Sequence, residues 1–180
     1  MTGRWVGIWT AAPQRADPAD LPPPPFTADG LVFRDSTLRQ TIKVSAGARR
    51  IRLRISNAFG AAVLGVARVG VALPGDGRAG ASRIEPGTSR AVTFAGRPGV
   101  VAAAGEHVVS DPVDFRVAAA DSVTVTMYLA DGLQAAGGVT AHPGSRTTSH
   151  MISGDHVADP RLPRAVPVDH WYLLNAVESG

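Results

Sequence analysis

Apolar and polar residues alternate with a period of two in two long segments of the chain. In the segment 50–56, Ile51, Leu53 and Ile55 alternate with three arginines. In the segment 122–129, an apolar residue stands at every odd position and Ser, Thr or Tyr at every even one. Successive side chains of a strand point to opposite faces, so the pattern predicts two strands with one buried and one solvated face.

Glycine and proline divide the rest of the chain into short pieces. The 20 Gly and 14 Pro residues are spread along the whole length, and most stretches between them are too short for a helix. Seven further segments are candidate strands: 5–10, 38–44, 64–73, 89–94, 106–109, 146–152 and 170–177. About nine short strands predict an all-β protein, an antiparallel two-sheet sandwich of jelly-roll-like type, formed by one domain over residues 1–180.

A Pro-rich connector over residues 13–30 is expected within this domain. Its run Pro22–Pro25 cannot donate hydrogen bonds to a sheet, so we expect extended, polyproline-like chain there. The alternative is a ligand for an aromatic groove on another protein. The stretches 74–80, 137–138 and 158–167 have the composition of loop tips.

Composition narrows the class of protein. The 180 residues are 44% hydrophobic and 18% charged, which is typical of a globular domain. The absence of cysteine excludes disulfides, cysteine nucleophiles and iron–sulfur clusters, and no cofactor is predicted. All but one of the 18 basic residues are arginine, the exception being Lys43, and the net charge is only +3. Few aromatic residues accompany these arginines, so no nucleic-acid partner is expected.

The hydropathy of the chain bears on its location. No apolar run approaches the ~20 residues of a membrane-spanning helix, and the first residues lack the apolar stretch of a signal peptide. We therefore expect a soluble protein without a membrane span. It would be cytoplasmic as written, and secreted if a leader was removed.

Motifs for self-contained catalysis are missing from the sequence. Neither Gly-x-Ser-x-Gly nor Gly-Asp-Ser occurs, and the nearest strings, 75–77 and 154–156, lack a hydroxyl at the required place. There is also no His-Glu-x-x-His, no phosphate-binding loop ending in Lys and Ser or Thr, and no EF-hand spacing. No catalytic residue is predicted.

Three groups of side chains could still carry chemistry. His150, Asp155 and His156 lie close in sequence and could hold a metal or act as a base, although satisfied strand-end histidines are the simpler interpretation. A stripe of three arginines, Arg50, Arg52 and Arg54, follows one strand, and Arg39 of a neighbouring strand could extend it. The stripe is either a face exposed to water or a surface that binds phosphates or carboxylates. A sugar-binding platform would need an exposed aromatic side chain, and the candidates are Trp5, Trp9 and Trp171 with its neighbour Tyr172. The alternative is that these side chains pack against the protein and fix the chain ends.

An ordered set of short strings resembles a known family. The strings are Trp5-Val6-Gly7-Ile8-Trp9-Thr10-Ala11-Ala12-Pro13-Gln14, Thr37-Leu38-Arg39-Gln40, Ser56-Asn57-Ala58-Phe59-Gly60, Ser110-Asp111-Pro112-Val113, Gly154-Asp155-His156 and Trp171-Tyr172-Leu173-Leu174. Their order and spacing are similar to those of the N-terminal β-domain that precedes the catalytic domain in bacterial GDSL-type (SGNH) hydrolases. The resemblance extends from Trp5 to about Val177.

The resemblance implies an accessory domain of an ester hydrolase. In that family a Gly-Asp-Ser strand, oxyanion-hole Gly and Asn blocks and a late Asp-x-x-His follow the β-domain, and none of these four blocks occurs in this sequence. The resemblance therefore implies a jelly-roll-like module beside an esterase or deacetylase domain, supplied in cis or in trans, that acts on acylated carbohydrates. Residues proposed to contact a substrate or partner are Arg39, Asn57, His142, Asp155 and Trp171.

Two of these residues also have a local interpretation. Asn57 lies in a string that would end a strand with a turn, and Phe59 would fold inward. Arg39, on an otherwise apolar strand, needs a carboxylate or carbonyl partner. The acidic residues that could serve are Asp35, Asp111 and Asp114.

Three functions remain open from the sequence. The first is the accessory β-domain that supports or shapes the substrate site of an SGNH-type catalytic domain. The second is a free-standing carbohydrate-binding jelly roll with exposed aromatic residues. The third is a protein that docks onto a separately encoded hydrolase domain through an apolar patch or the edge of its last strand.

Overall fold

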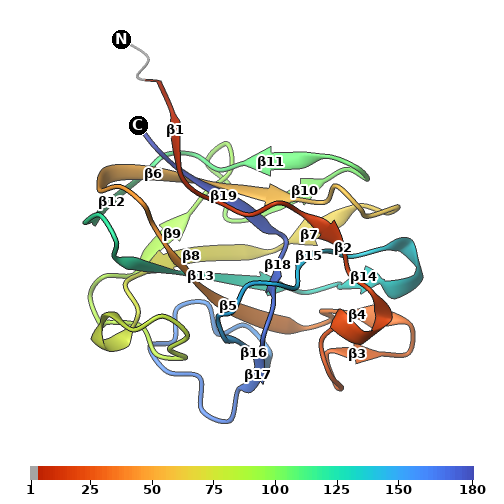
Figure 1. The fold of residues 1–180 in the computed structure, drawn as a ribbon. Helices are drawn as coiled ribbons and strands as arrows, with labels where there is room; N and C mark the ends of the chain where they lie inside the picture. The colour runs from red at the N-terminus through yellow and green to blue at the C-terminus, as the bar shows by residue number, and fades with distance from the viewer. Residues whose placement is uncertain (1–3) are drawn as a thin grey trace.

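Two antiparallel sheets lie face to face in the computed structural model, which describes residues 4–180 (Figure 1). The five-stranded sheet contains β1 (Val6–Thr10), β19 (Leu174–Ser179), β6 (Ala48–Ser56), β11 (His107–Val109) and, also paired with β6, β12 (Val113–Val117). The six-stranded sheet runs β17 (Val166–Val168), β16 (Ser149–Ser153), β5 (Ser36–Lys43), β13 (Ser122–Leu129), β8 (Arg68–Ala72) and β9 (Arg90–Val92). The predicted all-β antiparallel sandwich is confirmed.

Smaller elements border the two sheets. They are the pair β10 (Val100–Ala102) and β7 (Leu64–Val66), the group β14 (Leu133–Gln134), β4 (Leu31–Val32) and β3 (Thr27–Ala28), and the group β18 (Trp171–Tyr172), β15 (Thr140–His142) and β2 (Gln14–Arg15). Three 3-10 turns complete residues 4–180: η1 (Pro18–Asp20), η2 (Gly75–Gly77) and η3 (Ala135–Gly137). None of these helical turns is long or apolar enough to cross a membrane.

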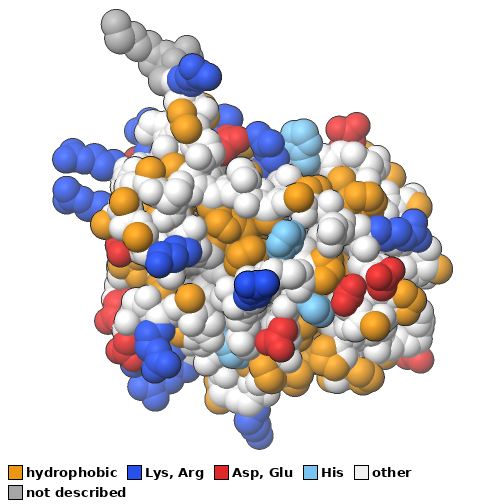
Figure 2. All heavy atoms as spheres, viewed as in Figure 1, with side chains coloured by type: hydrophobic (Ala, Val, Ile, Leu, Met, Phe, Trp, Pro, Cys, Tyr) orange, Lys and Arg blue, Asp and Glu red, His pale blue; other side chains and the backbone are white. Residues whose placement is uncertain are grey.

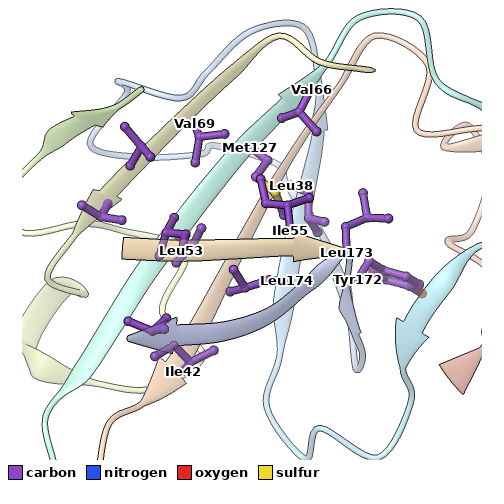
Figure 3. Close-up of a cluster of buried hydrophobic side chains, with 14 of the residues drawn as sticks. Leu38, Ile42, Leu53, Ile55, Val66, Val69, Met127, Tyr172, Leu173 and Leu174 are labelled. Carbon is purple, nitrogen blue, oxygen red and sulfur yellow. The ribbon is translucent and has the colours of Figure 1, made fainter. Parts of the chain in front are cut away.

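The hydrophobic core fills the space between the two large sheets. Leu53 and Ile55 of β6 face Leu38 of β5 and Met127 of β13, and all four side chains are inaccessible to solvent (Figure 3). Leu53, Ile55 and Met127 come from the apolar half of an alternating strand, whereas Leu38 shares its face of β5 with Gln40. Burying a side chain of this size stabilises the fold by roughly 1.5–3 kcal/mol, so the period-two pattern decides which face of each sheet turns inward.

One polar side chain lies on the inward face of β5 and is fully satisfied there. The amide of Gln40 donates to the Tyr172 carbonyl at 3.0 Å and accepts from the Tyr172 backbone N–H at 2.6 Å. The Tyr172 phenol, also buried, donates to the Asp20 carbonyl. Burial raises the pKa of Tyr172 well above its ordinary value. Gln40 therefore holds β18 against β5.

Several strand predictions agree with the structure, and others change in detail. The predicted segment 122–129 is β13, and 50–56 lies within β6. The segment 64–73 is divided between β7 and β8, and 170–177 between β18 and β19. The number of strands therefore exceeds the nine expected. Among the unpredicted strands is β12, whose burial alternates along its length.

The Pro-rich run turns instead of remaining extended. Phe26 donates its backbone N–H to the Pro23 carbonyl at 3.0 Å, which closes a turn at residues 24–25. Phe26 is buried in the core, and its backbone carbonyl accepts the Phe33 N–H at 2.8 Å. Burial of this aromatic ring draws the chain back, so the expectation of extended chain through Pro25 was wrong.

Candidate functional site

The outer face of the six-stranded sheet is polar and yet buried. Thr37, Arg39, Thr41, Thr124 and Thr126 all point away from the core and are at most 3% exposed. Two segments cover them, the loop 74–84 after β8 and the loop 154–165 after β16. Gly80 donates its N–H to Thr41 Oγ1 at 2.6 Å, and His156 donates its N–H to Thr37 Oγ1 at 2.9 Å. Thr41 and Thr37 thus bind the backbone of one covering loop each.

Arg39 is the centre of this buried polar layer. Its Nε donates to Thr126 Oγ1 at 3.0 Å, and its terminal nitrogens donate to the carbonyls of Ser82 at 2.8 Å, Asp159 at 2.7 Å and His156 at 3.4 Å. Burial lowers the pKa of Arg39 to about 10, although the charge of nearby Asp159 opposes the shift. The guanidinium therefore remains charged at neutral pH and joins both covering loops to the sheet.

The three aspartates considered as partners of Arg39 contact other groups. Asp35 accepts from the Tyr128 phenol at 2.8 Å and Asp114 pairs with Arg50 at 3.2 Å. Asp111 accepts from the Thr93 hydroxyl at 2.6 Å and from two backbone N–H groups, which lowers its pKa. The aspartate predictions were wrong because Arg39 reaches backbone carbonyls of loops distant in sequence.

Arg39 also does not extend the arginine stripe, because the stripe lies on the other sheet. Arg52 and Arg54 of β6 both pair with Glu178 of the neighbouring β19. Arg52 in addition lies over the ring of Trp5, 4.6 Å from its centroid. These arginines are thus engaged within their own sheet.

Asp155 and His156 belong to the loop that Arg39 binds. Asp155 pairs with Arg68 at 2.7 Å. His156 Nδ1 lies 2.6 Å from an Asp159 carboxylate oxygen, and its Nε2 lies 3.0 Å from the Ser153 carbonyl. The structure does not bring His150, Asp155 and His156 together as a metal site, and residues 4–180 contain no group of three or more acidic or histidine side chains placed for one.

His150 lines a cavity beside this polar layer. It stands opposite Arg39 in the pairing of β16 with β5. Together with the loop 75–83 it lines a cavity of about 320 Å³. Burial and the charge of Arg39 both lower the pKa of His150, so its imidazole is neutral at pH 7.

His142 and Trp171 are brought together, as opposite residues in the pairing of β15 with β18. Their rings stack with centroids 5.6 Å apart, and Trp9 meets Trp171 edge-on at 5.0 Å. Trp171 Nε1 donates to the Thr41 carbonyl at 3.0 Å. In Figure 2, histidine side chains lie beside hydrophobic ones near the middle of the face that is shown. Because His142 covers one face of Trp171, only part of this indole is available to a ligand.

Asn57 organises a turn, and Phe59 does not fold inward. The Asn57 amide donates to the carbonyls of Ala62, Ala102 and Ala103 at 2.8, 3.3 and 3.0 Å. Asn57 is itself 1% exposed, which leaves it no free surface for a ligand. Phe59 is 39% exposed, and the Thr140 hydroxyl accepts its backbone N–H and so fixes the backbone at this position; the prediction of Phe59 as an inward-facing residue was wrong.

Another cavity, of about 590 Å³, is lined by none of the five predicted residues. Its walls come from β7, β10 and the neighbouring loops, and they are mostly apolar, with Arg97 and Asp131 as the charged members. Sequence reasoning missed it, because its lining is scattered over four segments without a shared motif.

No hydroxyl is aligned with an imidazole anywhere in residues 4–180. His156 shows one half of a catalytic triad, because its Nδ1 lies beside the Asp159 carboxylate. Its Nε2, however, lies beside the backbone carbonyl of Ser153 and not beside a hydroxyl. A serine nucleophile needs its hydroxyl within reach of the base. No family model matches the chain, and no curated protein matches it.

Proposed function

We propose that this chain is the non-catalytic β-sandwich module of an SGNH-type ester hydrolase, which supports or shapes the substrate site of a catalytic domain supplied in cis or in trans. The sequence strings that resemble this family are the basis of the proposal. Its structural support is the way in which those strings contact one another.

The strings meet in pairs through direct contacts. Thr37 of one string donates to the Gly154 carbonyl of another at 2.5 Å and accepts from His156. Gln40 binds the backbone of Tyr172, which belongs to the last string, and Trp9 of the first string packs against Trp171. Residues of the strings that resemble the family thus join β5 to the segment 154–156 and to β18, and β1 to β18.

Hydrolysis assays of the chain alone and of a fusion test this function. The purified chain is expected to cleave p-nitrophenyl acetate no faster than buffer, and a fluorophosphonate probe is expected not to label it, because no described hydroxyl is paired with a base. An SGNH-type catalytic domain from the same organism serves as the positive control. Fusing the chain in front of that domain is expected to lower the KM for acylated sugars and leave kcat unchanged.

Two results would overturn the proposal. One is ester cleavage by the chain alone that fluorophosphonate suppresses. The other is a fusion with the same KM and kcat as the isolated catalytic domain.

A further inference from the structure

The cavity beside His150 combines a small volume with an excess of positive charge. It measures about 320 Å³ and lies between β16 and the loop 75–83. Its charged members are Arg78, Arg83 and Asp76. Arg83 pairs with Asp76, so the two charges offset each other, whereas Arg78 forms no ion pair within residues 4–180.

Arg39 adds a second positive charge directly behind the wall of this cavity. Ser82 lines the cavity, and its carbonyl accepts a hydrogen bond from Arg39 at 2.8 Å. The hydrogen-bond acceptors of the Arg39 guanidinium are three backbone carbonyls and one hydroxyl, all of them neutral. The Asp159 carboxylate lies near enough to compensate part of this buried charge, but burial still dominates, and an anion in the cavity would offset more of its cost.

His150, which lines the same cavity, has a hydrogen-bond donor without a partner. Its Nδ1 is buried without a partner, and a buried N–H without an acceptor is costly, so the proton of the neutral ring belongs on Nε2. Nε2 is neither buried in this way nor hydrogen-bonded within residues 4–180. The residues that line the cavity thus include an arginine without an ion pair and a histidine with an unpartnered N–H.

We propose that this cavity binds a small oxyanion, the phosphate or carboxylate group of a ligand, through Arg78 and His150 and next to the buried charge of Arg39. Guanidinium and N–H donors form charge-assisted hydrogen bonds with both groups. The volume of about 320 Å³ accommodates an anionic group or an anionic sugar. The proposal does not depend on the association with a hydrolase.

Titrations of the full chain followed by the imidazole signals in proton–carbon NMR spectra test the site. Sodium phosphate and sodium glucuronate are added at an ionic strength kept constant with sodium chloride, and glucose is the neutral control. We expect the His150 signal, identified by its loss in His150→Gln, to shift saturably with phosphate or glucuronate and not with glucose. The anion that binds more tightly distinguishes a phosphate ligand from a sugar acid.

Three variants separate this site from a general attraction of anions to a basic protein. Arg78→Gln is expected to weaken binding about tenfold, the usual effect of one charge-assisted hydrogen bond. Arg49→Gln, which removes an exposed arginine of the other sheet, is expected to leave the affinity unchanged. Asp76→Asn is expected to tighten binding, because it removes the negative charge and releases Arg83.

The proposal fails if neither anion shifts the His150 signal. It also fails if Arg49→Gln weakens binding as much as Arg78→Gln, since the attraction would then be diffuse. Tighter binding by Asp76→Asn is a result that mere loss of structure could not produce.

Discussion

Arg39→Ala is expected to lower the free energy of unfolding by about 3 kcal/mol. The substitution leaves the carbonyls of Ser82 and Asp159 and the hydroxyl of Thr126 without their donor, and it opens a cavity beneath both covering loops. Relief of the cost of burying the guanidinium, which is visible in its lowered pKa, offsets part of this loss. Urea unfolding followed by tryptophan fluorescence measures the difference.

A matched control and a local measurement make this result specific. Arg90 also donates to backbone carbonyls, those of Gly87 and Ser89, but it is exposed, so Arg90→Ala is expected to change stability by less than about 0.5 kcal/mol. Amide hydrogen exchange should rise in the loops 74–84 and 154–165 of Arg39→Ala and stay unchanged in β6. Equal stability of the two variants would show that Arg39 does not hold the loops.

The alternating segments could be predicted from the sequence because burial of one face leaves a period of two. The same pattern could not reveal that the polar face of β13 is covered. Thr124 and Thr126 were expected in water, yet two loops bury them. The Thr126 hydroxyl accepts a hydrogen bond from Arg39, and the Thr124 hydroxyl has no partner within residues 4–180. A threonine that faces water and one that is covered by a distant loop look alike in a sequence, so the buried polar layer had no sequence signal.

The sequence also contained no indication of the break between β18 and β19 at Leu173. The predicted strand 170–177 is interrupted there, where φ is 64°, a left-handed conformation that leucine rarely adopts. Its backbone N–H is bound by the Thr140 carbonyl, its carbonyl accepts from Ser56, and its side chain is buried. Tertiary contacts therefore override the local preference and carry the chain from β18 into β19.

Some residues of the candidate sites could be named from the sequence, and others could not. His142 and Trp171 were singled out separately, 29 positions apart in the printed sequence, and strand pairing places them in contact. In the sequence analysis, Arg78, the main residue of the proposed oxyanion site, was counted only as one of the basic residues. Its importance comes from the neighbouring cavity, and a cavity formed by a loop and a strand far apart in the sequence leaves no motif.

Gly60→Ala and Asn57→Ala are each expected to destabilise the protein by about 3 kcal/mol, and the double variant by hardly more than Asn57→Ala alone. A Cβ at Gly60 would lie 1.9 Å from Asn57 Oδ1, so Gly60→Ala displaces the Asn57 amide from its three carbonyl acceptors. In the absence of Asn57 the same methyl group meets no such obstacle. The two substitutions therefore remove the same hydrogen bonds, in which the two amide hydrogens of Asn57 are shared among three carbonyls. Leaving buried carbonyls without a donor costs about 1–3 kcal/mol, which sets the expected effect.

A double-mutant cycle from urea unfolding measures this coupling, with Gly65→Ala as the control because a Cβ there meets nothing within 4 Å. Additive effects would contradict the account, since they would mean that Gly60 is needed for a reason unrelated to Asn57. Strong coupling would identify Asn57 as the residue that shapes the turn 57–62. It would also explain why an asparagine with no exposed surface belongs to a string that resembles a hydrolase-associated domain: its amide fixes the backbone that carries Phe59 to the surface.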